Sequence, residues 1–201
     1  MKIFDSWKSW AEAKQSLALR LPVDTLNSLE QAFRFATGYH SEQKRPNGDP
    51  YIVHLLEVLE ILTEGGITDK DILLAGVLHD IVEDTSCALE EIERNFGVKV
   101  ANLVEWLTES VLDRKKYAAQ ARERYLAKLK AAPLDVVVIK LADRLSNVQK
   151  LDTHPKVEKQ RTYYRETIEK IMPLSKCSPW FSSQFKAWKN QFSFLAESEQ
   201  S

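Results

Sequence analysis

Apolar side chains recur along most of this chain at intervals of three and four residues, the period of an amphipathic α-helix. At the N-terminus the pattern predicts one amphipathic helix, or two short ones, built on Phe4, Trp7, Trp10, Ala11 and Leu17. Further helices are expected over residues 25–37, 50–64, 69–85, 88–95, 99–108, 115–130, 133–151, 156–172 and 180–196. Glycine and proline fall between these segments, so we predict a compact all-α bundle that forms a single domain over residues 1–201.

Residues that favour helix ends stand at many of these boundaries. They are the expected N-caps Asp24 and Asp69, the first-turn prolines Pro50 and Pro133, and the terminating glycines Gly65, Gly66 and Gly97. The apolar run over residues 136–139 also fits a buried strand. No partner strand is predicted, and the apolar pattern continues helically to Val148, so we expect a helix there.

The last predicted helix, over residues 180–196, is rich in aromatic side chains: Trp180, Phe181, Phe185, Trp188, Phe192 and Phe194. Their spacing is mostly helical. We expect this helix to cover the core, and a contact in a homo-oligomer is the alternative.

Composition narrows the class of protein and of partner. The 201 residues carry 28 Lys and Arg against 29 Asp and Glu, a formal charge of -1, which argues against a polyanion-binding tail and a nucleic-acid partner. No apolar run approaches the roughly 18 residues of a membrane span, and the N-terminus lacks a signal-peptide core. Cys87 and Cys177 stand far apart, so no disulfide framework or cysteine-rich zinc site is expected, and we predict a reduced, cytoplasmic protein.

The dipeptide His79-Asp80 is the sharpest chemical signal, because it follows an apolar run inside a predicted helix. Burying an aspartate there costs several kcal/mol unless its desolvation is compensated, and a metal ion compensates well. Glu83 follows His79 by four residues and Asp84 follows Asp80 by four, so each pair shares a face of the continuing helix. Acids at a helix C-terminus oppose its dipole, which favours a functional role for Glu83 and Asp84.

His54 and Asp143 interrupt two other apolar helices. Together with His79 and Asp80 they offer two nitrogen and two oxygen ligands, a set that suits a first-row divalent ion with positions left for water and phosphate. Four residues at intervals of three, four and three form one polar stripe on the helix predicted over residues 133–151: Lys140, Asp143, Asn147 and Lys150.

The order H…HD…D resembles the HD metal-dependent phosphohydrolase superfamily and, more narrowly, the hydrolase domain of the RelA/SpoT family. Four stretches carry the resemblance: GDPYIVH at 48–54, LHDIVEDT at 78–85, FG at 96–97 and KLADRLSN at 140–147. Gln43 and Arg45 match the polar loop before the first stretch. The resemblance covers about residues 25–175, and without room for the family's nucleotidyl synthetase domain the chain resembles the stand-alone small alarmone hydrolases.

The resemblance implies an all-α fold that binds one Mn²⁺ ion, with other first-row divalent ions as alternatives, through His54, His79, Asp80 and Asp143. It implies hydrolysis of the 3′-pyrophosphate of (p)ppGpp or (p)ppApp, which releases pyrophosphate and a nucleoside 5′-phosphate. Glu83 and Asp84 would orient or deprotonate the attacking water. Contacts with the nucleotide and its phosphates would come from Lys44, Arg45, Asn47, Lys140, Arg144, Asn147 and Lys150.

The chain departs from the family pattern at a few positions. Leu55 stands where the family usually has Pro, Asn47 where Ser is common and Ser146 where His is frequent, and Gln149-Lys150 replaces a frequent Arg-Thr. The last change falls near the expected phosphates and leaves guanosine alarmones, adenosine alarmones and NADPH open as substrates. Two alternative functions also remain, namely an HD phosphatase acting on NADPH or nucleoside monophosphates and a non-catalytic nucleotide-binding module.

Overall fold

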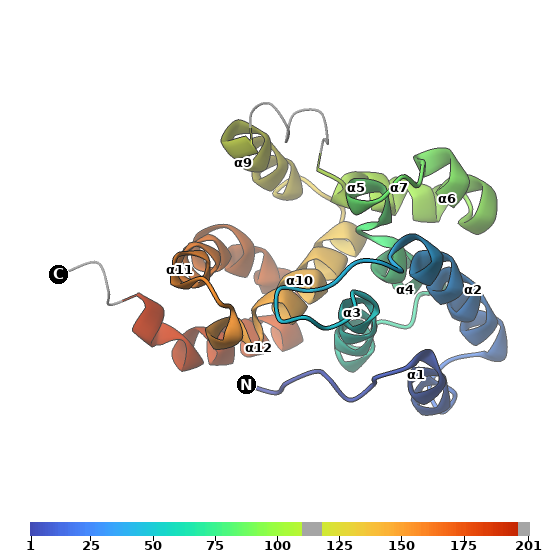
Figure 1. Ribbon diagram of the computed structural model, residues 1–201, viewed down its shortest axis with the longest axis horizontal. Coiled ribbons are helices and arrows are strands. Elements are labelled where there is room, and N and C mark those ends of the chain that lie inside the picture. The colour runs from blue at the N-terminus through green and yellow to red at the C-terminus, as the bar shows by residue number, and fades with distance from the viewer. Residues whose placement is uncertain (110–117, 197–201) are drawn as a thin grey trace.

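Helices build the computed structural model, which describes residues 1–109 and 118–196 and has no strand within those ranges. The predicted all-α class is therefore confirmed (Figure 1). The α-helices are α1 (Trp10–Leu17), α2 (Val23–Tyr39), α3 (Ile52–Glu64), α4 (Lys70–Leu78), α5 (Ile81–Asp84), α6 (Leu89–Phe96), α7 (Val98–Leu107), α9 (Ala118–Leu129), α10 (Leu134–Val148), α11 (Val157–Glu166) and α12 (Pro179–Gln191). Short helical turns follow some of them: η1 (Leu151–Thr153), η2 (Thr167–Ile171), η3 (Met172–Cys177) and η4 (Ser193–Leu195). None of the described helices is long and apolar enough to cross a bilayer.

Helix α10 lies at the centre of the bundle and packs against α3, α4 and α7 (Figure 1). Its apolar run is buried all round, which explains why residues 136–139 resembled a buried strand. Helices α3 and α4 also pack on each other, and Gly76 lies at their contact. A Cβ atom at Gly76 would come within 2.5 Å of Leu62 Cδ1, so glycine permits the close approach of the two helices.

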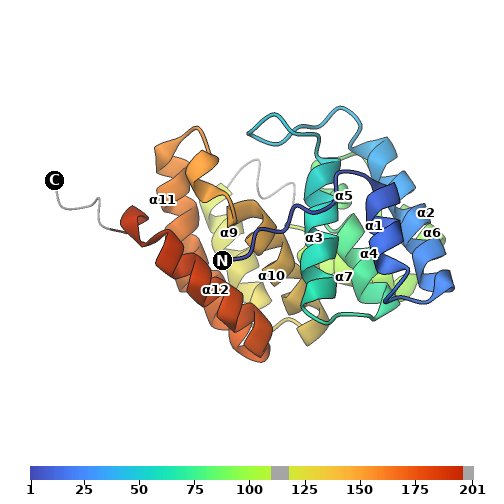
Figure 2. The ribbon, with the colours of Figure 1, turned by 90° about the horizontal axis from the view of Figure 1, so that it is seen from below.

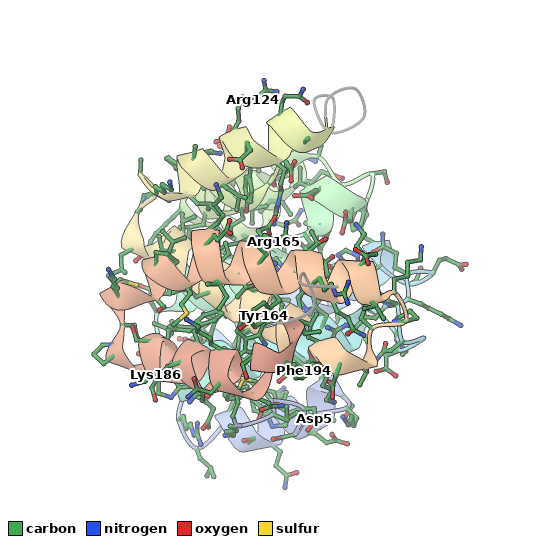
Figure 3. All side chains as sticks on the ribbon, turned by 90° about the vertical axis from the view of Figure 1, so that its left-hand side faces the viewer. Asp5, Arg124, Tyr164, Arg165, Lys186 and Phe194 are labelled. Carbon is green, nitrogen blue, oxygen red and sulfur yellow. The ribbon has the colours of Figure 1, made fainter. Side chains whose placement is uncertain are left out.

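The C-terminal helices cover the core, as predicted. Figure 3 shows α9, α11 and α12 one above another on one face of the molecule. Phe181, Phe185, Trp188 and Phe192 are buried, and Trp188 Nε1 donates a hydrogen bond to the Val148 carbonyl at 2.9 Å. Phe194 is the exception in this helical stretch, because more than half of it is exposed.

The N-terminal segment contradicts the predicted helix over Phe4 and Trp7. Residues 1–9 run as an extended strap past α3 toward α1, which begins only at Trp10 (Figure 2). The side chain of Gln149 accepts from the Phe4 N–H at 2.8 Å and donates to the Phe4 carbonyl at 3.1 Å, in the manner of a neighbouring strand. Glu60 receives the N–H and the hydroxyl of Ser6. These distant partners, and burial of the Phe4 ring, outweigh the local helical period.

Some predicted helix ends are confirmed and others shift. Asp69 caps α4 with its carboxylate, and Gly65 and Gly97 end α3 and α6. Pro22 takes the N-cap position of α2, so Asp24 lies in the first turn instead. Helix α3 begins two residues after Pro50, because Pro50 pairs with Lys44 in an isolated β-bridge.

Toward the C-terminus, four predicted helices differ in extent, and the one predicted over 180–196 ends as α12 at Gln191. Helix α10 ends at Val148 rather than residue 151, and the helix predicted over 156–172 turns into a π-helix at Thr167. The first residues of the helix predicted over 115–130 lie outside the described ranges, and from Ala118 that helix is present as α9.

Candidate active site

The chain does not continue as one helix through His79 and Asp80, contrary to the prediction. Helix α4 ends at Leu78, and the one-turn helix α5 begins at Ile81. Consecutive side chains of a regular helix point away from each other. At this break Asp80 has φ -100° and ψ -4°, and its Oδ2 atom lies 2.9 Å from His79 Nε2. The break therefore turns the two adjacent side chains toward the same point.

Two further helices bring His54 and Asp143 to that point. His54 on α3 places Nε2 3.2 Å from His79 Nε2 and 3.6 Å from Asp80 Oδ2. Asp143 on α10 places Oδ1 3.5 Å from His54 Nε2 and 3.6 Å from His79 Nε2. The four ligand atoms all lie within 4.8 Å of one another, so the predicted ligand set is brought together.

Both imidazole rings are held with Nε2 toward the cluster. His79 Nδ1 lies 2.9 Å from the Gly76 carbonyl, which can only accept, so the proton is on Nδ1. His54 Nδ1 lies 2.8 Å from Ser146 Oγ. Because that hydroxyl donates its own proton to Glu57, it accepts one from His54. In each ring Nε2 is thus the nitrogen that faces the cluster, where a metal ion would take the place of a proton.

The electrostatics of the cluster favour positive charge. Burial alone lowers the pKa of His79, yet the Asp80 and Asp143 carboxylates raise it to about 10. Burial alone raises the pKa of Asp80 and Asp143, yet His79 holds the Asp80 pKa well below its ordinary value, and Lys140 with both histidines does the same for Asp143. Two ionised, buried carboxylates and two oriented imidazoles fit a divalent first-row cation.

The predicted polar stripe on α10 is confirmed for three of its four members. Lys140 Nζ donates to Asp143 Oδ2 at 2.7 Å, and Asn147 Nδ2 donates to Asp143 Oδ1 at 2.5 Å. Burial lowers the pKa of Lys140, but the Asp143 charge raises it above its usual range, so Lys140 is protonated. Lys150 lies beyond the end of α10 and forms an ion pair with Asp5 at 2.8 Å instead.

A cleft of about 570 Å³ opens beside the cluster. One part of its lining is acidic: Asp80, Glu83, Asp84 and Glu109. Another part is basic: Arg122, Lys140, Arg144 and Lys159. Glu83 Oε2 accepts the Glu109 N–H at 2.9 Å, which fixes its carboxylate in the cleft. Both acids predicted for proton transfer therefore line the same cleft as Asp80 of the cluster.

A smaller groove of about 160 Å³ adjoins this cleft, since Asn147 and Tyr163 line both. The predicted substrate contacts divide between the two spaces. Lys140 and Arg144 line the cleft, whereas the groove is lined by Arg45, Asn47 and Lys150. Lys44 is exposed and lines neither space.

Carboxylates already hold the predicted phosphate-binding arginines. Arg144 is buried, bonds to Glu166 and lies 5.6 Å above the Tyr163 ring. Arg122 binds the same Glu166 carboxylate at 2.6 Å. A phosphate in the cleft would share Arg144 with Glu166. Arg45 is bound by Glu57 in the same way, at 2.6 Å.

Several residues of the site were missed at the sequence level. Tyr51, given no role of its own within the GDPYIVH stretch, donates its hydroxyl to Asp80 Oδ2 and stacks on His40 with ring centroids 4.6 Å apart. Gln43 joins His40 Nδ1 to the Asp84 carbonyl, with both contacts at 2.7 Å. Glu57 had a usable signal, an acid three residues after His54 in an apolar helix. Nothing in the sequence pattern pointed to Glu166.

Comparison with known proteins places these residues in context. A family model described as the HD domain matches residues 32–174. A protein of Streptomyces coelicolor named GTP pyrophosphokinase is 42% identical over 159 residues, which are 78% of this chain and 18% of that protein. A protein of Aquifex aeolicus named guanosine-3′,5′-bis(diphosphate) 3′-pyrophosphohydrolase is 36% identical over 175 residues, 85% of this chain and 25% of its own length. The chain thus spans a quarter or less of these relatives.

The solved structures include one described as a metazoan ortholog of SpoT that hydrolyses ppGpp and plays a role in starvation responses. It matches with a TM-score of 0.75 and 26% identity, and the match covers 82% of this chain and 94% of that one. Unlike the curated relatives, this neighbour is matched over nearly all of its length.

Proposed function

Because the chain belongs to the HD-domain family, we propose that it is a metal-dependent hydrolase acting on the 3′-pyrophosphate of (p)ppGpp or (p)ppApp. The products are pyrophosphate and a nucleoside 5′-phosphate. The observation that carries the proposal is the convergence of His54, His79, Asp80 and Asp143 beside an acidic and basic cleft. The names of the Aquifex and metazoan relatives supply the substrate class.

The four clustered side chains would hold one Mn²⁺ ion. Such an ion, when bound, neutralises phosphate charge and makes a water molecule more acidic. Lys140 keeps the Asp143 carboxylate ionised and Asn147 helps to orient it, while the Tyr51 hydroxyl orients Asp80.

Glu83 is placed to accept a proton from the attacking water. Its carboxylate lines the cleft with Asp80, and the Glu109 N–H holds Oε2 in a fixed orientation. Asp84 lines the same wall, where its backbone carbonyl is tied to Gln43. A positioned carboxylate of this kind contributes about 10²- to 10⁴-fold to rate as a general base.

We assign the two adjoining spaces to the two ends of such a substrate. We place the scissile pyrophosphate in the cleft, near Lys140 and Arg144, and the rest of the nucleotide in the smaller groove near Arg45 and Asn47. Asn147 lines both spaces and would contact the nucleotide where they join.

A product assay tests this function. The protein is given Mn²⁺ with ppGpp and ppApp together, and nucleotides, pyrophosphate and orthophosphate are resolved by chromatography. Pyrophosphate release by the wild type, lost in Asp80→Asn and kept in the exposed control Asp24→Asn, is the expected result. Orthophosphate release from NADPH or nucleoside monophosphates, without pyrophosphate from either alarmone, would refute the proposal in favour of a phosphatase. Binding without turnover would refute it in favour of a nucleotide-binding module.

A further inference from the structure

We propose that Arg45, Glu57 and Ser146 form a relay that orients the His54 ring, so that Nδ1 carries its proton and Nε2 faces the metal centre. The inference rests on the metal centre of the proposed function, and it gives these three residues a role in positioning rather than in contact with the reacting atoms.

The relay is a chain of short contacts that runs from the groove to the cluster. Arg45 Nη1 donates to Glu57 Oε2 at 2.6 Å, and Ser146 Oγ donates to the same oxygen at 2.5 Å. Ser146 Oγ lies 2.8 Å from His54 Nδ1. Arg45 also reaches the Ser146 backbone carbonyl, at 3.3 Å. All three residues line the groove, and Glu57 and Ser146 are buried there, with 4% and 2% exposed.

The direction of each proton follows from the chemistry of the groups. An arginine can only donate, and an ionised carboxylate can only accept, so Glu57 receives from both Arg45 and Ser146. The single Ser146 proton is committed to Glu57, which leaves its oxygen to accept the proton on His54 Nδ1. His54 Nε2 is then left with a lone pair toward the cluster.

His54 depends on this relay in a way that His79 does not. The His79 Nδ1 proton is held by the backbone carbonyl of Gly76, which no side-chain substitution removes. The His54 proton is held by a side-chain hydroxyl, and a hydroxyl can rotate to donate as well as accept. Without Glu57, Ser146 would be free to donate to Nδ1. The ring proton would then lie on Nε2, where Asp80 and Asp143 at 3.6 and 3.5 Å attract it and where it blocks metal binding.

A second buried glutamate on the same helix provides a matched control. Glu60 is as buried as Glu57, at 4% exposed, but bonds to Ser6 of the N-terminal strap and not to Ser146. Ser175 is a similar control for Ser146, because it is 2% exposed and donates to the Met172 carbonyl away from the cluster. If the loss of any buried polar contact weakened Mn²⁺ binding, substitutions at the two relay positions and at the two control positions would weaken it equally.

The test measures Mn²⁺ affinity by calorimetry in Ser146→Ala, Glu57→Leu and Glu57→Gln, with Ser175→Ala and Glu60→Gln as controls. We expect Ser146→Ala and Glu57→Leu to weaken Mn²⁺ binding about 10- to 100-fold, the usual cost of losing a partner that orients a ligand. Glu57→Gln keeps an acceptor oxygen for Ser146, so its Mn²⁺ affinity should lie between that of these two variants and that of the wild type. Both controls should bind Mn²⁺ as the wild type does.

A spectroscopic measurement separates positioning from structural support. In the Zn²⁺-loaded, ¹⁵N-histidine-labelled protein, the wild-type His54 ring should show a proton on Nδ1 and coordination through Nε2. Glu57→Leu should lose this pattern at His54 while His79 keeps it. Wild-type Mn²⁺ affinity and an unchanged His54 pattern in both Ser146→Ala and Glu57→Leu would overturn the relay, as would equal weakening in the two controls.

The metal titration needs no substrate, so its failure is distinguishable from failure of the proposed function. Relay-dependent Mn²⁺ binding without turnover of ppGpp or ppApp would refute the proposed reaction and leave the relay intact. Turnover together with relay-independent Mn²⁺ binding would refute the relay alone. A wild type that binds no Mn²⁺ would overturn both, since both rest on the metal centre.

Discussion

Replacing Lys140 by methionine isolates the energetic cost of breaking the buried charge pair next to the candidate metal cluster. Lys140 Nζ lies 2.7 Å from Asp143 Oδ2, and both side chains are almost entirely buried. Methionine keeps most of the aliphatic length of lysine, so packing in α10 changes little. What is lost is the positive charge, including its position 5.2 Å above the Tyr125 ring.

The magnitude follows from what Asp143 retains. Removing one partner of a buried ion pair costs about 3–5 kcal/mol because a buried charge is left uncompensated. Asp143 keeps its hydrogen bond from Asn147 and its contacts with both histidines, so we expect the lower end, about 3 kcal/mol. For a chain of this size 1 kcal/mol shifts the melting temperature by about 2–4 °C, so the expected fall is about 6–12 °C.

Thermal unfolding of Lys140→Met and Lys150→Met, followed by circular dichroism in EDTA, tests this reasoning. Lys150 forms an ion pair of nearly equal length with Asp5, at 2.8 Å, but the side chains of both residues are substantially exposed. Such pairs contribute about 0–1 kcal/mol, so Lys150→Met should melt within about 4 °C of the wild type. Adding Mn²⁺ should reduce the difference in melting temperature between Lys140→Met and the wild type, because the cation compensates the charge of the Asp143 carboxylate. Equal shifts in the two variants would refute the argument from burial.

Three further predictions concern the acids of the site. Asp80→Asn should lose turnover while keeping its far-ultraviolet circular dichroism spectrum, and a wild-type rate would exclude Asp80 as a ligand. Glu83→Gln should bind Mn²⁺ normally in calorimetry yet turn over about 10²-fold slower, and an unchanged rate would remove its role in proton transfer. Burial alone raises the pKa of Glu166, but Arg122 and Arg144 lower it from 4.5 to about 2, so its ionised form stabilises the fold. About 3 kcal/mol of stability, present above pH 4.5, should therefore disappear as the pH falls from 4.5 to 2. Urea unfolding of the wild type and Glu166→Gln at pH 5 and pH 3 measures this, and parallel losses in the two proteins would contradict it.

The parts of the fold predicted correctly depend on local interactions. Asp69 caps α4 because its carboxylate reaches N–H groups two and three residues ahead, which short-range pattern reasoning captures. The strap at residues 1–9 was missed because its partners are distant. Phe4 pairs with Gln149 and Ser6 with Glu60, and no helical period distinguishes a buried strap from an amphipathic helix.

In the candidate site, too, contacts within one helix were predictable and contacts between distant elements were not. Lys140, Asp143 and Asn147 are spaced to meet on one face of a helix, so their contacts were predictable from the sequence. The resemblance to the HD superfamily supplied the grouping of His54 with Asp143, which spacing alone left open. The contact of Tyr51 with Asp80 joins residues from different elements, and no period in the sequence encodes it.

The break after Leu78 explains why a dipeptide of adjacent residues can begin a metal site. In an unbroken helix of 3.6 residues per turn, the Cα–Cβ bonds of His79 and Asp80 would diverge by about 100° around the axis. Because α4 ends there, both face the contact between α3, α4 and α10. The remaining ligands must therefore come from the helices packed at that contact, α3 with His54 and α10 with Asp143. The close approach of α3 and α4 at Gly76, where a Cβ atom would come within 2.5 Å of Leu62 Cδ1, helps to bring the helix that carries His54 beside the helix that precedes His79.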